Sequence, residues 1–171
     1  MGAKRGPGAM LPYFASGRVV TGFGRGGKQL GCPTANLEDA TVSDLPVDFD
    51  CGVYYGFASV DGGPLNGMVM SIGWNPQFKN TRKSMEVHIL RSFDDDFYGS
   101  FLKIVITGFV RPMTSFSSLD ELVKAIDEDI RIAREKLTTD DLNKYAAHEF
   151  FNTPIPSGSQ PPQHHDVNGK L

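Results

Sequence analysis

Residues 51–75, CGVYYGFASVDGGPLNGMVMSIGWN, contain two short runs that are separated by turn-forming residues. The runs CGVYYGFASV (51–60) and GMVMSIGWN (67–75) are rich in the β-branched and aromatic residues that favour strands. The segment DGGPLNG between them has the glycine, proline and asparagine content of a turn. The pattern predicts two strands joined directly, without an intervening helix.

The same pattern recurs on both sides of this segment. Further strand-like runs are GRVVTGFG (17–24), SMEVHIL (84–90) and FLKIVITGFV (101–110). The stretches between them, NPQFKNTRK and DDDFYGS, have the composition of turns and loops. Five or six strands with no helix between them predict an antiparallel barrel or sandwich, and this pattern alone does not choose between the two.

One helix is expected near the carboxyl end, in SSLDELVKAIDEDIRIAREKL (117–137). Ser118 and Glu121 have the spacing of a capping box. Apolar residues then repeat every three or four positions: Leu119, Leu122, Val123, Ile126, Ile130, Ala133 and Leu137. We expect this face to pack on the outside of the barrel, and Lys124, Asp127, Glu128 and Arg131 to face water. A second short helical stretch is expected around 140–149.

Composition indicates one globular domain. The chain has 171 residues, of which 40% are hydrophobic and 22% charged. We expect the domain to span residues 11–152, between disordered tails at 1–10 and 153–171 that are rich in glycine, proline and polar residues. The adjacent His164 and His165 are expected to belong to a solvated tail and not to a metal site.

Charge and cysteine content limit the partners. The net charge of −3 gives no attraction to a polyanion, so we expect no nucleic-acid partner. No apolar run is long enough to span a bilayer, so we expect no membrane partner. The two cysteines are too few for a disulfide framework and favour the cytoplasm. We expect a monomer.

The glycine-rich stretch TGFGRGGKQLGCPTAN (21–36) matches two phosphate-binding patterns only superficially. A P-loop requires Ser or Thr after its lysine, and here Gln29 follows Lys28. A dinucleotide fingerprint requires a following helix, and Leu-Gly-Cys-Pro does not favour one. A protein-kinase glycine loop would need further motifs and a much longer chain.

The glycines can still serve an anion site, because they allow backbone N–H groups to approach phosphate, with Arg18, Arg25 and Lys28 nearby. A hairpin without any ligand is the alternative. Thr34 and Asn36 stand at alternate positions of an extended segment, so their oxygens point the same way. Two neutral oxygens could share an Mg²⁺ whose other ligands are phosphates and water, and such ligands also admit Mn²⁺ or Zn²⁺.

The motif GRVVTGFGRGGKQLGCPTAN resembles the signature of the eukaryotic, monofunctional riboflavin kinases. GVYYGFASV, MVMSIGWNP, KSMEVHIL, DDFYG and GFVRP match that family in order and spacing. The resemblance implies a mainly β fold, a six-stranded antiparallel Greek-key barrel with a carboxy-terminal helix. It also implies transfer of the γ-phosphoryl of ATP to the ribityl 5′-hydroxyl of riboflavin, giving FMN and ADP.

Glu86, in SMEVHIL, matches the family's catalytic carboxylate, and the resemblance implies that it is the general base. The residues alone favour a more ordinary interpretation. Glu86 shares a strand face with His88, and both could decorate the wet outer surface of the barrel. A carboxylate facing the interior would instead be costly unless it were paired or functional.

The resemblance implies further binding roles. For each of these residues the simpler alternative is a core position or a solvated loop without a ligand. Thr34 and Asn36 would bind the metal. The residues implied to bind ATP are Gly22, Gly24, Arg25, Gly26, Lys28, Pro33, Thr34, Asn36, Arg91, Phe97 and Tyr98. Those implied to contact flavin are Arg111, Met113, Phe116, Lys79 and Arg82.

Departures from the family pattern are few. Cys32 stands where the family often has Phe or Ile, and Gly27 replaces a frequent Ser. We expect no adenylyltransferase activity, so FAD synthesis should fall to another protein. Two other interpretations remain open: a flavin-binding barrel without transferase activity, which has no need for Thr34, Asn36 and Glu86 together, and an oligonucleotide-binding barrel, which the acidic balance disfavours.

Overall fold

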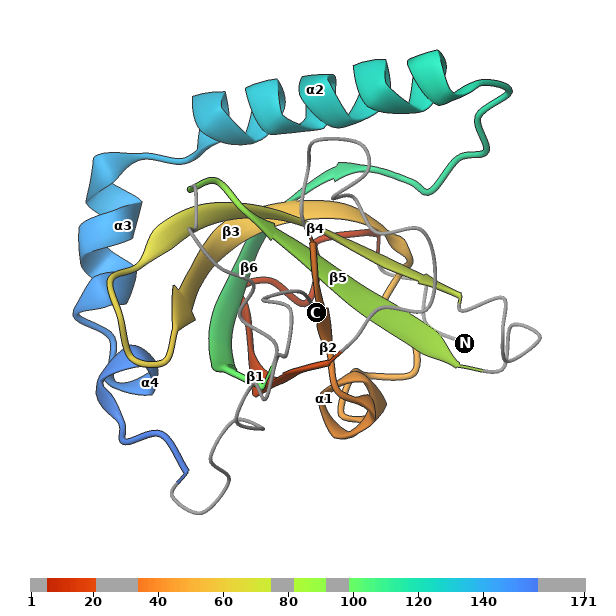
Figure 1. Cartoon of the computed structure of the whole chain (residues 1–171). Coiled ribbons are helices and arrows are strands. Elements are labelled where there is room, and N and C mark those ends of the chain that lie inside the picture. The colour runs from red at the N-terminus through yellow and green to blue at the C-terminus, as the bar shows by residue number, and fades with distance from the viewer. Residues whose placement is uncertain (1–5, 21–33, 75–81, 92–98, 157–171) are drawn as a thin grey trace, which may run out of the picture.

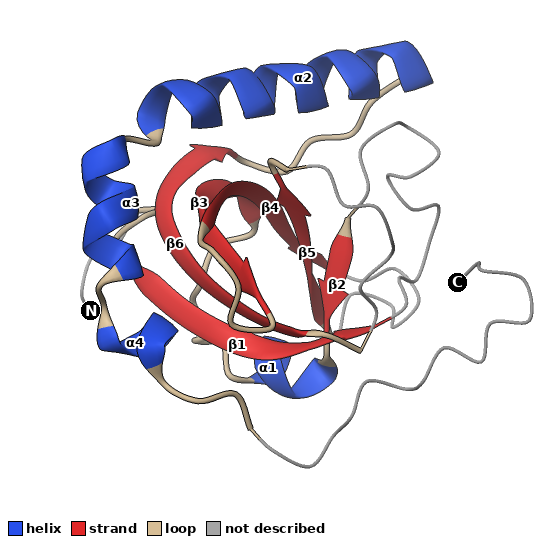
Figure 2. Ribbon diagram, turned by 60° about the vertical axis from the view of Figure 1, so that its left-hand side comes forward, coloured by secondary structure: helices blue, strands red, loops and turns tan. Residues whose placement is uncertain are grey.

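Six antiparallel strands close into a barrel (Figure 2). The structure is a computed structural model that describes residues 6–20, 34–74, 82–91 and 99–156. The strands are β1 (Tyr13–Val20), β2 (Ala35–Leu37), β3 (Gly52–Val60), β4 (Asn66–Trp74), β5 (Lys83–Ile89) and β6 (Phe101–Arg111). Their order around the barrel is β1-β2-β5-β4-β3-β6, so β2 reaches across to β5 as in a Greek key. The expected six-stranded barrel is confirmed, and the sandwich alternative is wrong.

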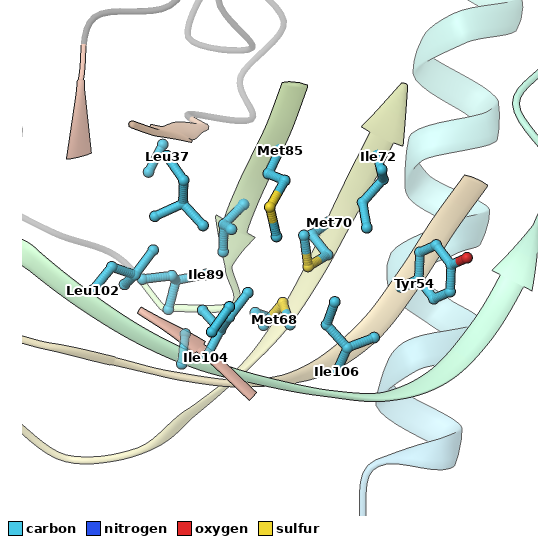
Figure 3. Close-up of a cluster of buried hydrophobic side chains, with 14 of the residues drawn as sticks. Leu37, Tyr54, Met68, Met70, Ile72, Met85, Ile89, Leu102, Ile104 and Ile106 are labelled. Atoms are coloured by element: carbon cyan, nitrogen blue, oxygen red, sulfur yellow. The ribbon is translucent and has the colours of Figure 1, made fainter. Parts of the chain in front are cut away.

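Alternation along the strands fills the barrel interior with apolar side chains. The fully buried positions include Met68, Ile72, Met85, Leu102 and Ile104. These side chains come from the three strands β4, β5 and β6 and share one core (Figure 3). The intervening residues of each strand point outward, because successive side chains of a strand face opposite sides.

Strand boundaries differ from the sequence prediction at the amino end. β1 begins at Tyr13, four positions before the expected start at Gly17, and Phe14 joins an aromatic cluster with Tyr145 and Phe151 outside the barrel. The expected strand residues 21–24 lie outside the described residues. The short α1 (Asp39–Ser43) was not predicted, because five residues are too few to show a helical period.

The main helix, α2 (Leu119–Lys136), lies across the outer face of β3 and β4 (Figure 1). Ala133 is fully buried there, with Ile130 and Leu137 packed beside Val53 and Val69. The expected water-facing residues Lys124, Asp127, Glu128 and Arg131 are exposed.

Two positions of α2 depart from the expected amphipathic pattern. Leu119 is 62% exposed, because it is the first residue of the helix and the close packing is formed further along, around Ile130 and Ala133. Asp129, in contrast, is buried on the packed face. The capping box is half formed: Ser118 Oγ accepts from the Glu121 N–H, while the Glu121 carboxylate accepts from Ser117.

The second helical stretch is two helices, α3 (Thr139–Ala146) and α4 (Glu149–Asn152). The buried ammonium of Lys103, on β6, donates to the carbonyl oxygens of Phe150 at 3.0 Å and Thr153 at 2.6 Å. It thereby fastens the end of α4 to the barrel, since a cation is favourable at a helix carboxyl end. Met10 also packs on the core, so contacts reach one residue beyond 11–152 at each end. Among the helices of the described ranges, not one combines the length and apolar character needed to cross a membrane.

At Gly56 the backbones of β3 and β6 approach each other closely. A Cβ at this position of β3 would lie 1.9 Å from the carbonyl oxygen of Val105 on β6. We expect Gly56→Ala to lower the free energy of unfolding by about 3 kcal/mol, because neither backbone can yield without breaking the β3·β6 ladder. Urea unfolding measures this. Gly6→Ala is the control, since a Cβ at Gly6 meets nothing within 4 Å, and a loss in Gly56→Ala no larger than in the control would contradict the expectation.

Candidate functional site

A row of polar side chains crosses three neighbouring strands on the outer face of the barrel. Asn36 of β2 stands directly opposite Glu86 of β5, and Glu86 stands opposite Ser71 of β4. Directly opposed residues share a face, with Cβ atoms about 4.5 to 5.5 Å apart. The flanking residues Ala35 and Val87 point into the core, which places the row outside. Asn36 and Glu86 are therefore neighbours, although they lie far apart in the sequence.

Glu86 faces outward yet is not on a wet surface. The side chain is half-buried, and burial raises the pKa of its carboxyl above the ordinary glutamate value, since desolvation disfavours the charged form. Between described residues, neither an ion pair nor a hydrogen bond of Glu86 offsets this cost. A partly desolvated carboxylate with a raised pKa has the properties of a general base. His88 lies on the same face, opposite Val69.

Asn36 presents a buried acceptor. The residue is 6% exposed, and its Oδ1 has no hydrogen-bond partner within the described part of the chain. A buried carbonyl oxygen without a partner costs free energy, which a ligand can recover. Because an amide oxygen only accepts, the ligand must be a cation or a hydrogen-bond donor. Thr34, the other residue predicted to bind the metal, lies two residues before Asn36 and is half-buried.

The surface beside Glu86 is formed by small residues. Gly73 of β4 stands opposite Ser84 of β5, one step along from the pair Ser71 and Glu86. All three small residues are half-buried. Among the described residues, a Cβ at Gly73 would find only the side chain of Met113 within 4 Å, with Cε at 3.5 Å. We call Ser71, Gly73 and Ser84 the small-residue floor; these side chains occupy little volume beside Glu86, and Met113 lies at the edge.

Arg111 lies at the far end of the same row. It is opposite Val53 on β3, and Val53 is opposite Ser71. Its guanidinium forms a two-pronged ion pair with Asp129 of α2, Nε to Oδ1 at 2.7 Å and Nη2 to Oδ2 at 2.8 Å. It also lies over the ring of Phe116, 5.5 Å from the centroid. The structure thus brings together Arg111, Phe116 and Met113, three of the residues predicted to contact flavin.

Sequence reasoning missed Asp129, Ser71, Gly73 and Ser84. A weak signal for Asp129 was present, because an acidic residue three positions after Ile126 and four before Ala133 falls on the apolar stripe of the helix. The small residues carried no signal. They matter only through the volume that they leave empty.

The remaining predicted residues are less closely grouped. Arg82 is largely exposed just before β5 and lies 3.7 Å from Asp39 of α1. Arg91 is exposed just after β5. Predicted site residues that lie outside the described residues are Gly22, Gly24, Arg25, Gly26, Lys28, Pro33, Lys79, Phe97 and Tyr98. The described residues contain no group of three or more His, Cys, Asp or Glu side chains that could hold a metal ion.

The family model and the curated relatives indicate one family. The family described as "Flavokinase: Riboflavin kinase" matches residues 9–137. Human riboflavin kinase is 51% identical over 141 residues, which cover 82% of this chain and 91% of that protein. The bifunctional riboflavin kinase/FMN phosphatase of Arabidopsis thaliana is 45% identical over 135 residues, covering 79% of this chain and 35% of that protein. The crystal structure of riboflavin kinase from Trypanosoma brucei superimposes with a TM-score of 0.69 at 30% identity, covering 90% of this chain and 94% of that one.

The raised pKa of Glu86 predicts a stability change with a definite sign. A carboxyl whose pKa is higher in the folded state destabilises the fold once it ionises, so stability falls as pH rises from 4.5 through the raised value. We therefore expect Glu86→Gln to raise the melting temperature of the ligand-free chain at neutral pH, and to lose this advantage below pH 4.5.

Calorimetry of the wild type and the variant at both pH values measures this difference. Glu121→Gln is the matched control with the opposite sign, because hydrogen bonds from Ser117 lower the pKa of Glu121. A Glu86→Gln variant that melts below the wild type at neutral pH would show that the carboxylate is stabilised in the folded state.

Proposed function

The chain belongs to the riboflavin kinase family and is an ATP-dependent phosphotransferase with an alcohol acceptor, and we propose that the row Asn36, Glu86 and Ser71 is where it phosphorylates riboflavin. The reaction moves the γ-phosphoryl of ATP to the ribityl 5′-hydroxyl and forms FMN and ADP. One observation carries the proposal: a half-buried carboxylate with a raised pKa stands directly opposite a buried amide oxygen that lacks a partner.

Glu86 acts as the general base. Its carboxylate accepts a hydrogen bond from the ribityl 5′-hydroxyl and takes the proton as the hydroxyl oxygen bonds to the γ-phosphorus. The bond from the γ-phosphorus to the bridging oxygen breaks, and ADP leaves with that electron pair. Phosphoryl transfer demands mainly positioning and charge compensation from the protein. A carboxylate set into a strand supplies a fixed position.

Asn36 and Thr34 hold the divalent cation together with the ATP phosphates. The buried, unpartnered Oδ1 of Asn36 fits this role, because oxygen is the ligand that hard cations prefer. Mg²⁺ is the expected ion, and neutral oxygens would also accept Mn²⁺ or Zn²⁺. When bound, the cation offsets negative charge on the phosphates. The Asn36 side chain therefore orients the donor on one side of Glu86.

The acceptor lies on the other side of Glu86, over the small-residue floor. Glu86, Ser71, Val53 and Arg111 are successive partners on four neighbouring strands. Glu86 and Arg111 are therefore three strand spacings apart, about 14 Å across the sheet. Val53 is buried under α2, so the flavin ring must lie along the edge formed by Gly73, Met113 and the Arg111–Phe116 pair. We propose that Arg82, two residues before Ser84 of the floor, also contacts the flavin; Lys79, for which the same role is proposed, lies outside the described residues.

The nucleotide is proposed to extend from Asn36 toward the glycine-rich segment that contains Gly22 and Lys28. Arg91, which follows β5, lies at the end of the strand that carries Glu86. Phe97 and Tyr98 would pack against the adenine. We propose that the protein acts as a monomer in the cytoplasm, with no nucleic-acid or membrane partner; the net charge of −3 and the two cysteines support this.

Formation of FMN from riboflavin, ATP and Mg²⁺ tests the function directly. We expect the wild type to form FMN, and Glu86→Gln to lower kcat by about two orders of magnitude or more with riboflavin binding retained. Asn36→Leu should lose activity without losing stability, because it removes a buried oxygen that has no hydrogen-bond partner among the described residues. Removal of divalent cations by EDTA should abolish turnover.

Glu128→Gln, a change at an exposed glutamate of α2, is the control for this assay. A wild-type chain that binds flavin and forms no FMN would instead be a carrier barrel. Full activity of the Glu86→Gln variant would show that the carboxylate is not the general base.

A bulkier side chain in the small-residue floor should weaken binding of riboflavin and leave binding of ATP unchanged. Gly73→Val adds a side chain where only Met113 is close, in a strand position that tolerates β-branched residues. We expect KM for riboflavin to rise at least about tenfold, the effect of losing some 1.4 kcal/mol of binding, with KM for ATP unchanged. Glu128→Gln, an exposed change on α2 outside the floor, is the control. An equal rise of both KM values would mean that the floor does not serve riboflavin specifically.

A further inference from the structure

Asp129 is a buried acidic residue on the packed face of α2. It is 4% exposed, whereas its neighbours Glu128 and Arg131 pair with each other on the exposed side of the same helix. Burying a carboxylate is costly unless it is paired and hydrogen-bonded. Here both carboxylate oxygens accept from Arg111, at 2.7 and 2.8 Å. The helix is thus joined to the end of β6 by a charged contact within an otherwise apolar interface.

The ion pair fixes the orientation of the guanidinium. Nε and Nη2 point at Asp129, while Nη1 points away from it, toward Pro112 O at 3.3 Å and Thr114 Oγ1 at 3.4 Å. The Cζ atom of the guanidinium lies over the ring of Phe116, 5.5 Å from its centroid. A two-pronged contact of this kind restrains both the position and the plane of an arginine. Asp129 therefore determines how the Arg111 guanidinium is presented to a flavin bound along the edge formed by Gly73 and Met113.

Stability alone does not account for this pair. Replacing a buried ion pair by apolar residues of similar volume is often neutral or stabilising. The interface around it is already apolar, with Ile130 and Ala133 on α2 packed beside Val53 and Val110. A leucine in place of Asp129 would suit that packing. The charged pair is better explained by what it does to Arg111.

We propose that Asp129 is a positioning residue for riboflavin: through the two-pronged ion pair it holds Arg111, and with it Phe116, in the orientation that receives the flavin ring. The inference rests on the proposed function, in which the flavin extends from Glu86 along the small-residue floor to the Arg111–Phe116 pair. Asp129 does not touch the substrate. Its effect on binding passes through Arg111, which makes the proposal testable by a double-mutant cycle.

The test measures the dissociation constant of riboflavin by flavin fluorescence and the steady-state constants for both substrates. We expect Asp129→Asn to raise the riboflavin dissociation constant and KM at least about tenfold, the scale of one charge-assisted hydrogen bond, with KM for ATP unchanged and kcat retained at saturating riboflavin. Glu128→Gln, which breaks the exposed ion pair one residue away, should change none of these constants.

The double-mutant cycle separates positioning from packing. In an Arg111→Met background, Asp129→Asn should cause no further loss of riboflavin affinity, because the residue through which it acts is gone. A purely structural role would lower the melting temperature and leave riboflavin binding unchanged, or change it equally with and without Arg111. Either result would overturn the proposal.

A second variant covers the case in which Asp129→Asn does not fold. Arg111→Met combined with Asp129→Leu removes both charges, and we expect it to fold as well as the wild type. Its riboflavin affinity should still fall at least about tenfold, and unchanged affinity would overturn the proposal. Riboflavin binding and Glu86→Gln kinetics are separate readouts. Full activity of Glu86→Gln would contradict the proposed function, while the binding cycle would still report on Asp129.

Discussion

The closed packing of the barrel interior is the constraint on which the rest of the structure depends. Side chains such as Met68, Met85 and Ile104 are fully buried in the core between the strands (Figure 3). A small barrel packed in this way has no interior room for a substrate. All polar chemistry must therefore lie on the outer face, and alternation along β2 and β5 places Asn36 and Glu86 there.

An outward carboxylate would ordinarily be solvated and would titrate like a free glutamate. Glu86 is different because it is half-buried, and desolvation raises its pKa without a compensating partner among the described residues. Asn36 beside it holds a buried oxygen without a hydrogen bond. Two adjacent groups that each lose free energy in the ligand-free state are arranged to recover it when ligand binds. This pattern is common where a fold gives up stability for function.

Helix α2 completes the outer site and stabilises the fold at the same time. Its apolar face covers Val53 and Val69, while Asp129 binds the guanidinium of Arg111 at the end of β6. The same helix thus closes one side of the small-residue floor and determines the orientation of an arginine at its edge. Under the proposed function, packing and riboflavin recognition share one element, so the position of α2 would affect both.

The sequence by itself determined the local features. Runs of β-branched and aromatic residues between turn-forming segments marked β3, β4, β5 and β6, the Ser118 cap marked the start of α2, and the family motifs marked Glu86 and Asn36. Only the tertiary structure decided that β2 pairs with β5, that Glu86 stands between Asn36 and Ser71, and that Asp129 is buried against Arg111. The physical reason is the distance in sequence over which each effect acts. Strand propensity and helix capping act between residues a few positions apart, whereas strand pairing and desolvation depend on which distant segments meet when the barrel closes.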